Sequence, residues 1–383
     1  MLMLIIASAI FVDFFGGSFS YALFYACLCV PLTSFAYVLY VYTQLKVYQT
    51  IEAKITTKGN QIKYYYVLAN EAFMFFKSID LVFMSDYSKV DAKKPKGKIS
   101  LIPGEKLECE SSLTCLYRGE YEVGIESVLI QDCFGLFSMK IKRPSTINAR
   151  VYPRIIKLSS LAALQFNEDA KVSPFSLSAK HEIPDTELKG YANGDSPKTI
   201  NWKVSAKYGE LFVRRYTELP KERILLFLDT SPVSMDHMIL EDALLETTIA
   251  IANYYQQEKI ESEIVYYTDK AHHFHIKNNE DFHYFYEESA FLQFNSTFDI
   301  GEYIQENLPR FNAFSMLIII TTDINQKTRQ AISYAQNIHT CAILIGDIED
   351  EELQNIRIQL GKMKCINIPK NKNISTILEK SYD

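Results

Sequence analysis

The sequence predicts a multidomain protein with an N-terminal transmembrane hairpin, an antiparallel β-sandwich and an α/β Rossmann-like domain. The first 45 residues contain a single charged side chain, residues 46–154 contain short alternating runs, and strands alternate with helices from residue 223 onward. These patterns are typical of membrane helices, antiparallel sheets and covered parallel sheets, in that order. The predicted parts are residues 1–45, 46–154, a connecting segment 155–222, and 223–383.

The N-terminus predicts a membrane anchor. Asp13 is the only charged residue among the first 45. Residues 18–42 are long enough to cross a bilayer core, which takes roughly 20 apolar residues, whereas residues 2–15 form a shorter segment. Gly16–Gly17 would make the turn of a hairpin. A cleaved signal peptide is the alternative, with a cleavage site at residues 7–9, but the start lacks a basic region and a stronger apolar segment follows.

Basic residues predict the orientation of this anchor. The turn between the two apolar segments contains no Lys or Arg, and several lysines follow the second segment. They are Lys46, Lys54, Lys58 and Lys63. The positive-inside rule therefore places everything after residue 45 in the cytoplasm, whether one span forms or two.

Residues 46–154 are predicted to be strands separated by turns such as Lys58-Gly59-Asn60 and Pro103-Gly104-Glu105. Short strands at this spacing favour an antiparallel sandwich. Nothing in this part has catalytic spacing, so we expect an interaction or spacer domain. The predicted strands are 62–68, 79–83, 98–102, 113–117, 127–130 and 139–141.

From residue 223 onward, strands alternate with helices, which implies crossover connections and a mostly parallel, covered sheet. Ligands of such folds bind at the carboxyl ends of the strands, and Asp229 and Asp323 occupy such positions. The predicted strands are 224–228, 264–267, 273–276, 316–320, 342–345 and 365–368. The predicted helices are 238–258, 298–308, 326–337 and 350–361.

The composition excludes several classes of protein. The net charge of −6 and the pI near 5.8 argue against a nucleic-acid-binding protein, which normally has a basic face. The seven cysteines are scattered without a C-x-x-C pair, so neither a disulfide framework nor a zinc site is predicted, and a reducing compartment is expected. Phosphate-binding glycine loops, H-E-x-x-H and G-x-S-x-G are absent from the sequence, and no small-molecule substrate is evident.

Polar side chains from three predicted loops point to a metal site. Asp229, Ser231 and Ser234 follow one strand, Thr297 precedes a helix, and Asp323 follows another buried strand. Oxygen ligands of this kind suit Mg²⁺ or Mn²⁺. The alternative is that Asp229 and Ser231 cap a helix and that Asp323 forms hydrogen bonds, with no metal bound.

Two histidines form a weaker candidate for a metal site. His273 and His275 share one face of a predicted strand, as two metal ligands would. Because no further Cys or His lies nearby in the sequence, a half-exposed strand is the preferred interpretation.

The first loop resembles the metal-ion-dependent adhesion site of von Willebrand factor type A domains, which reads Asp-x-Ser-x-Ser. Val233 stands where the second Ser would be, and Ser234 is displaced by one residue beside Pro232. Valine has no lone pair, so one ligand is missing unless the loop bulges. The resemblance implies a type A-like domain with a degenerate metal loop.

A longer resemblance covers nearly the whole chain. Residues 188–195 (LKGYANGD), 198–203 (KTINWK) and 211–214 (LFVR), with Ala206 and Gly209 between them, are similar to the signature of domain-of-unknown-function family 58. Segments 117–121, 132–137 and 151–154 resemble that family as well. The signature residues are Tyr191, Gly194, Asp195, Lys198, Trp202 and Arg214.

The expected role of these signature residues is structural. Gly194 would form a tight turn, and Trp202 would bury a large apolar surface against the neighbouring sheet. Lys189 and Lys198 stand where the family usually has Arg. Lys cannot bind a carboxylate bidentately, so any such pairing with Asp195 is weaker.

The resemblance also implies a partner, because proteins of this family typically accompany MoxR-type AAA+ ATPases. We therefore expect a membrane-anchored cytoplasmic scaffold or adaptor, not an enzyme, that works with such an ATPase in the assembly or maturation of envelope or protein complexes. One alternative is a metal-dependent hydrolase with Asp229 and Asp323 as ligands, for which no general base is clearly placed. The other is a structural envelope protein without a partner.

Overall fold

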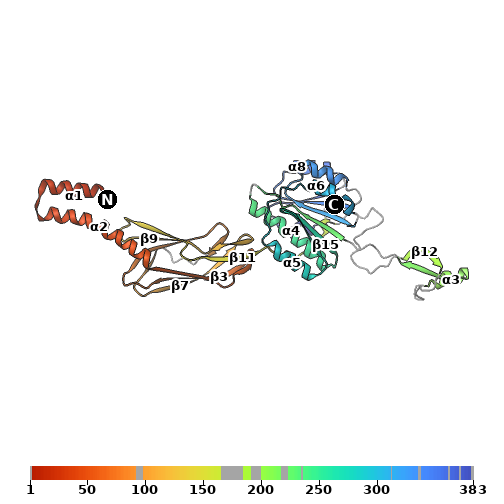
Figure 1. Ribbon diagram of the computed structural model, residues 1–383, viewed down its shortest axis with the longest axis horizontal. Helices are drawn as coiled ribbons and strands as arrows, with labels where there is room; N and C mark the ends of the chain where they lie inside the picture. Colours follow the sequence, from red (N-terminus) through yellow and green to blue (C-terminus); the bar gives the residue numbers. More distant parts are fainter. Residues whose placement is uncertain are drawn as a thin grey trace. The chain divides into compact units, whose positions relative to one another are not determined.

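The structure of the protein is a computed structural model (Figure 1). It forms two compact units, one of Met1–Arg154 with Glu287–Leu292, and one of Ile155–Tyr286 with Gln293–Asp383. The residues that the structure describes are 2–91, 98–164, 184–190, 200–216, 223–233, 236–311, 313–334, 338–360, 363–370 and 372–380.

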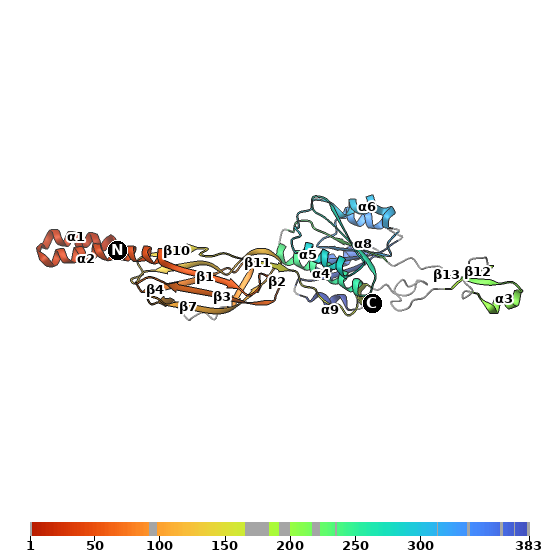
Figure 2. The ribbon, with the colours of Figure 1, turned by 60° about the horizontal axis from the view of Figure 1, so that its bottom comes forward.

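Two apolar helices begin the first unit. Helix α1 (Leu2–Phe15) and helix α2 (Gly17–Gln44) lie side by side in an antiparallel hairpin (Figures 1 and 2). Gly16 and Gly17 have φ angles of 57° and 87°, a left-handed backbone that favours glycine, so the turn forms where it was predicted. Helix α2 is long and apolar enough to cross a membrane, whereas α1 is shorter.

The last part of α2 belongs to the core of the first unit. Val38 and Val41 are buried among side chains of the sheets. The Tyr37 hydroxyl donates to the Phe75 carbonyl at 2.9 Å and accepts from the Lys77 N–H at 3.1 Å. This end of the helix therefore packs against the sheets of the first unit.

A buried carboxylate joins α2 to the sheets. Asp132 accepts hydrogen bonds from the Ser34 hydroxyl and from the backbone N–H groups of Phe134 at 3.0 Å and Phe137 at 2.9 Å. Burial alone would raise the pKa of Asp132, but these hydrogen bonds outweigh burial and hold the pKa below its ordinary value. Ser34 therefore marks the point at which α2 enters the protein interior.

The strands of the first unit form two four-stranded antiparallel sheets, β1-β3-β7-β5 and β10-β9-β4-β6, and a third sheet, β2-β11-β8. The two larger sheets contribute to one hydrophobic core. Each of the six predicted ranges overlaps a strand, 113–117 only at the end of β7, whereas β1, β2, β5, β8 and β11 were not predicted. The strands are β1 (Leu45–Ile51), β2 (Ile55–Thr57), β3 (Gln61–Asn70), β4 (Phe76–Phe83), β5 (Ser88–Asp91), β6 (Ile99–Leu101), β7 (Lys106–Cys115), β8 (Gly119–Val123), β9 (Ile125–Gln131), β10 (Ser138–Lys142) and β11 (Ile147–Tyr152).

The signature region contains a small antiparallel pair that the sequence did not predict. Strand β12 (Pro184–Gly190) pairs with β13 (Phe212–Tyr216), and helix α3 (Trp202–Tyr208) lies between them in the chain. The Asn201 side chain caps α3 at its start, and Gly209, at φ 75°, ends it.

The expected burial of Trp202 is wrong, because this side chain is 66% exposed. Trp202 is the first residue of α3, and Ser205 is the only buried residue of this short helix. The Ser205 hydroxyl accepts from the Phe212 N–H at 2.9 Å and so holds α3 against β13. Trp202 lies one helical turn before Ser205 and takes no part in that contact.

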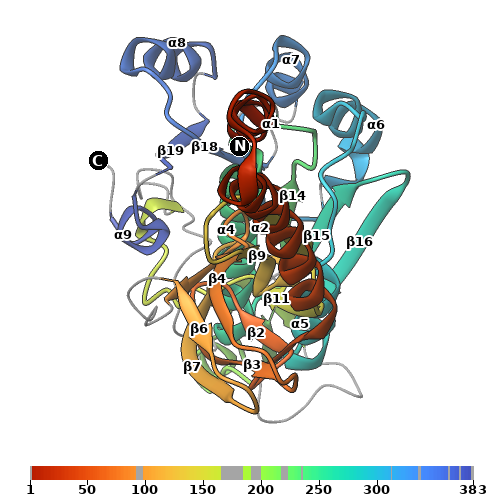
Figure 3. The same ribbon diagram turned by 90° about the vertical axis from the view of Figure 1, so that its left-hand side faces the viewer.

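The second unit contains a six-stranded sheet in the order β16-β15-β14-β17-β18-β19 (Figure 3). All neighbours are parallel except β15 and β16, as the alternation of strands and helices predicts. The strands are β14 (Arg223–Leu228), β15 (Glu261–Tyr267), β16 (Ala271–Ile276), β17 (Met316–Thr321), β18 (His339–Ile345) and β19 (Lys364–Ile368).

Helices cover both faces of this sheet. Helices α6, α7 and α8 pack on one face, and α4 and α5 lie on the other (Figures 1 and 3). The helices are η1 (Ala162–Leu164), α4 (His237–Gln257), α5 (Asn279–Ser289), α6 (Ile300–Phe311), α7 (Gln326–Tyr334), α8 (Asp350–Leu360) and α9 (Ile374–Leu378). Because both faces are covered, the accessible parts of the sheet are its strand ends and its edges.

The contribution of α2 can be measured with two truncated proteins. A fragment that begins at Thr33 keeps Ser34, Val38 and Val41, whereas a fragment that begins at Lys46 loses all three. Burying each valine stabilises by roughly 1.5–3 kcal/mol, so we expect the shorter fragment to have a free energy of unfolding lower by about 3–6 kcal/mol. Urea unfolding measures the difference, and equal stabilities would contradict this role of α2.

Asp132 predicts a dependence of stability on pH. Its pKa is lowered in the folded protein, so its contribution is present above the unfolded pKa of about 3.9 and is lost as the pH falls through the lowered folded pKa. We expect Asp132→Asn to remove this part of the acid dependence and to lower the free energy of unfolding at neutral pH by about 1.5–3 kcal/mol. Chemical unfolding at several pH values checks both effects, and Asp86→Asn, on an exposed loop, is the matched control.

Candidate functional site

The carboxyl ends of β14 and β17 hold Asp229 and Thr321 against each other. Asp229 follows the last residue of β14, and its N–H donates to the Ile320 carbonyl at 2.9 Å. Its Oδ1 accepts from the Ser231 N–H at 2.9 Å, and its Oδ2 accepts from the Thr321 hydroxyl at 2.6 Å. The half-buried carboxylate is therefore held between its own loop and the neighbouring strand.

The same hydroxyl links Asp229 to the loop that carries Asp323. Thr321 is fully buried, and its Oγ lies 2.7 Å from the Asp323 carbonyl oxygen and accepts from the Asp323 N–H at 3.2 Å. A hydroxyl has one proton, and a carboxylate is a stronger acceptor than a peptide carbonyl, so the proton is donated to Asp229. The Asp323 carboxylate is exposed, and within the described ranges it has neither a hydrogen bond nor an ion pair.

A third loop is tied to this end of the sheet by Thr230. The Thr230 hydroxyl donates to the Tyr267 carbonyl at the end of β15, and the Thr230 carbonyl accepts from the Ser296 N–H at 3.0 Å. Ser296 is buried, and its neighbour Thr297 is exposed. The structure therefore gathers all three predicted loops, and we call the residues they present the strand-end face: Asp229, Ser231, Thr297 and Asp323.

Two further polar residues, Asp299 and Asn325, support this face, and they were not identified from the sequence. Asp299 Oδ1 accepts from the Gly301 N–H at 2.7 Å, and Oδ2 accepts from the Asn325 amide at 2.8 Å, which joins the first turns of α6 and α7. A Cβ at Gly301 would lie 2.8 Å from backbone atoms of Lys327 and Thr328, so glycine permits the close approach of the two helices. Both polar residues directly precede a helix, which is a sequence signal for an N-cap.

The donor atoms of the strand-end face match a hard divalent cation in type, because all are oxygens. Val233 contributes no oxygen from its side chain, and both oxygens of Asp229 already accept hydrogen bonds. Ser234 lies outside the described residues. No three His, Cys, Asp or Glu side chains are grouped to hold a metal ion in the part of the chain that the structure describes. Binding of Mg²⁺ or Mn²⁺ therefore stays a prediction.

Two of the six signature residues, Trp202 and Arg214, lie within the described residues. Tyr191, Gly194, Asp195 and Lys198 lie outside the described residues. Trp202 is in α3, and the backbone of Arg214 in β13 pairs with Leu188.

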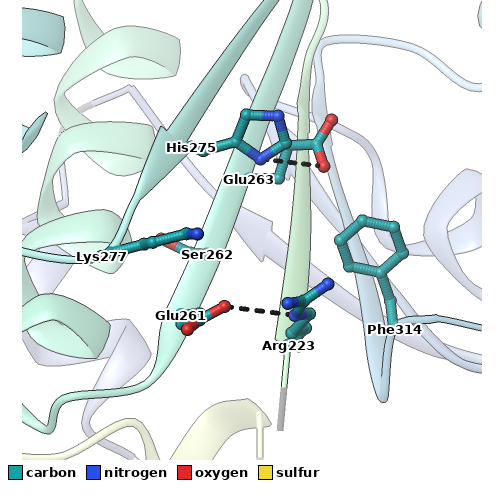
Figure 4. Close-up of a pocket in the computed structure, with 7 residues that line it drawn as sticks. All are labelled: Arg223, Glu261, Ser262, Glu263, His275, Lys277 and Phe314. Carbon is teal, nitrogen blue, oxygen red and sulfur yellow. Dashed lines mark ion pairs between the residues drawn. The ribbon is translucent and has the colours of Figure 1, made fainter. Parts of the chain in front are cut away.

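A buried glutamate on the same sheet was also missed in the sequence. The Glu263 side chain is 5% exposed and is surrounded by three cationic or imidazole groups. His273 Nδ1 lies 2.9 Å from one carboxylate oxygen, His275 Nδ1 lies 3.4 Å from the other, and Arg310 of α6 donates to the first (Figure 4 shows His275). The two histidines share one face, as predicted, and both contact Glu263 on a partly exposed strand, in agreement with the preferred interpretation.

The comparison with protein families finds one match. Residues 187–273 match the family described as "Protein of unknown function DUF58", which confirms the resemblance to domain-of-unknown-function family 58. No curated protein matches the chain.

Several solved structures show weak similarity. The conserved hypothetical protein BatB from Bacteroides thetaiotaomicron is 12% identical, with 41% of this chain and 94% of that chain covered and a TM-score of 0.30. Proximal thread matrix protein 1 of the mussel byssus is 12% identical over 42% of this chain and 46% of that chain, with a TM-score of 0.33. A FixG-related protein from Vibrio parahaemolyticus is 12% identical over 28% and 96%, with a TM-score of 0.20. These TM-scores are too low to establish a shared fold.

The Thr321 hydroxyl can be tested by Thr321→Val, which keeps the shape of the side chain. The change leaves one carboxylate oxygen of Asp229 without its donor, so we expect the free energy of unfolding to fall by about 1.5–3 kcal/mol. Thr322→Val, one residue further along, is the matched control and should change stability little. Equal effects of the two changes in chemical unfolding would contradict the role assigned to Thr321.

Proposed function

With the DUF58 match as the premise, we propose that this DUF58 protein is a membrane-anchored adaptor that docks a protein partner on its strand-end face. The observation that carries the proposal is the exposed Asp323 carboxylate, whose backbone bonds to the same Thr321 hydroxyl that binds Asp229. An exposed charge on a loop that hydrogen bonds already hold in place can pair with a charged group of a partner. Little conformational entropy of the loop is then lost on binding.

The shape of this face supports docking more than catalysis. A catalytic site normally lies in a deep pocket with convergent polar groups. Among the described residues, cavities of about 260, 550 and 670 Å³ are lined by residues outside this face, and Thr297 and Asp323 are exposed. The alternative, a metal-dependent hydrolase with Asp229 and Asp323 as ligands, would instead require a deep pocket at this face.

We further propose that the α/β unit is a von Willebrand factor type A-like domain with a degenerate metal loop. Asp229, Ser231, Thr297 and Asp323 would hold Mg²⁺ or Mn²⁺, and a bound cation would supply an open coordination position for an acidic side chain of the partner. Without a cation, Asp323 and Thr297 present a carboxylate and a hydroxyl to basic or hydrogen-bonding groups.

The hairpin of α1 and α2 is proposed to anchor the protein with its remaining domains in the cytoplasm. Support comes from the apolar part of α2 before Ser34, from its exposed large side chains, and from the lysines that begin at Lys46. The family resemblance makes a MoxR-type AAA+ ATPase the proposed partner, in the assembly or maturation of envelope or protein complexes.

A photo-crosslinking amino acid at position 297 tests this function in the native membrane. We expect a crosslink from position 297 to an AAA+ ATPase, and its loss in Asp323→Lys, because the substitution reverses the free charge. Position 334 is the matched control, since Tyr334 is 68% exposed and ends α7, whereas the strand-end face lies near the start of that helix. Equal crosslinking from both positions would overturn docking at this face.

Calorimetric titration with Mg²⁺ and Mn²⁺ separates the two modes of docking. Binding that Asp229→Ala abolishes supports a cation-bridged contact. No binding to the folded protein would leave the metal-free mode of docking. It would mean that the loop with Val233 in place of Ser does not bind a cation.

A further inference from the structure

Strand β16 is an edge of the α/β sheet, since β15 is its neighbour on one side only (Figure 3). Its six residues pair with β15 in an unbroken antiparallel register. The strand contains neither proline nor a bulge, two devices that commonly protect an edge. The opposite edge strand, β19, has three buried residues out of five: Cys365, Ile366 and Ile368. In β16 only Ile276 is buried.

The register shows which backbone groups point away from the sheet. Thr268 and Lys270 continue the β15–β16 register beyond the pair Tyr267–Ala271. The Thr268 N–H donates to the Lys270 carbonyl at 3.1 Å, so these two residues form a pair of the hydrogen-bonded kind. Antiparallel pairs alternate between hydrogen-bonded and non-hydrogen-bonded kinds. The N–H and C=O groups of Ala271, His273 and His275 therefore point outward, and no bond to them occurs within the described residues.

The two faces of this edge differ in chemistry. Ala271, His273 and His275 lie on the face that α6 covers, and Lys277 and Arg310 lie near them. The other face carries His272 and Phe274, and the Phe274 ring lies 5.9 Å from that of Tyr284, which is exposed. An added strand would therefore have basic and imidazole groups on one face and aromatic groups on the other.

Two cavities flank this edge. One of about 260 Å³ is lined by Arg223, Glu261, Glu263, His275, Lys277 and Phe314 (Figure 4). Its acids are engaged, because Glu261 pairs with Arg223 at 3.2 Å and Glu263 is held by His273, His275 and Arg310. The Lys277 ammonium has no ion pair within the described ranges. The lining of a second cavity of about 550 Å³ includes Phe274, Tyr284 and Asp281. The Asp281 carboxylate accepts from the Lys277 N–H at 3.0 Å and the Asn278 N–H at 3.3 Å.

We propose that β16 is a docking edge for an extended acidic segment of a partner protein, which adds to the sheet as a further strand. Its backbone bonds to Ala271, His273 and His275, as in other complexes in which a peptide extends a sheet. Side chains of the added strand alternate between faces, so acidic residues lie beside His273, His275 and Lys277, and apolar residues lie beside His272 and Phe274. Recognition therefore requires a period of two, and not only negative charge.

Charge selects this occupant over a second copy of the chain. Paired antiparallel, two β16 edges would bring Lys270 of each copy beside Lys277 of the other. β16 itself contains no acid to offset them. Like charges across a strand pair are unfavourable, so the same groups that attract an acidic strand discourage self-association.

The test uses the full chain in detergent and a fluorescent peptide of about eight residues, an ordinary strand length, in which glutamate and valine alternate. We expect saturable binding that weakens with salt. A peptide of the same composition with all glutamates before all valines, and one with lysine in place of glutamate, should bind at least about tenfold more weakly, because neither matches both faces.

A proline substitution separates backbone pairing from charge attraction. Ala271→Pro removes one outward N–H without removing a bond to β15, and edge strands tolerate proline at such positions. We expect about tenfold weaker binding of the alternating peptide, whereas Ala271→Ser, which keeps the N–H, should leave it unchanged. Lys277→Glu should also weaken binding, and Asp323→Lys should not, which distinguishes this edge from the strand-end face.

Three results of the peptide experiments would overturn the proposal. They are equal binding of the alternating and block peptides, equal affinity of the Ala271→Pro and Ala271→Ser proteins, and no binding by the folded parent protein. Concentration-dependent dimerisation that Ala271→Pro abolishes would identify a second copy as the occupant and would also overturn it.

Discussion

The parallel pairing of β14 with β15 on one side and β17 on the other is the constraint on which the accessible surfaces of the α/β sheet depend. Parallel strands end at the same edge, so Asp229, Tyr267 and Thr321 meet although they are far apart in the chain. Crossover helices then cover both faces. What stays open to solvent is the row of strand ends and the outermost strand, and both proposed contacts of this unit lie there.

At the strand-end face and at strand β16, the less exposed carboxylates are hydrogen-bonded, whereas the exposed Asp323 and Lys277 have no ion pair within the described residues. Asp229 is held by Ser231 and Thr321, and Glu263 by His273, His275 and Arg310. A buried carboxylate without partners would be costly, so these contacts satisfy a requirement of the interior. Asp323 and Lys277 are exposed, so water solvates their charges and leaving them unpaired has little energetic cost. Each charge favours a partner group of opposite sign.

In the first unit, helix α2 contributes both to the apolar hairpin and to the hydrophobic core. The apolar part of α2 pairs with α1, and its last turns supply Val38 and Val41 to the core beneath the sheets. Asp132 accepts a hydrogen bond from the Ser34 hydroxyl, where the helix begins to pack against the sheets. Since β1 begins at Leu45, directly after the helix, no flexible linker separates the proposed membrane segment from this core.

Most strands and helices of the second unit could be predicted from the sequence, because the periodicity of apolar residues is local, whereas α5, β12 and β13 were missed. The sequence located β14 to β19, the main helices, the Gly16–Gly17 turn, and Asp229 and Asp323 at strand ends. Contacts between distant groups could not be predicted: Thr321 with Asp229, and Arg310 with Glu263, 47 residues away. Trp202 shows the limit most clearly, since its size predicts burial, but its position at the start of α3 leaves it exposed. A local pattern specifies an element and its apolar face, whereas the partner of that face depends on pairing between segments that the chain brings together only on folding.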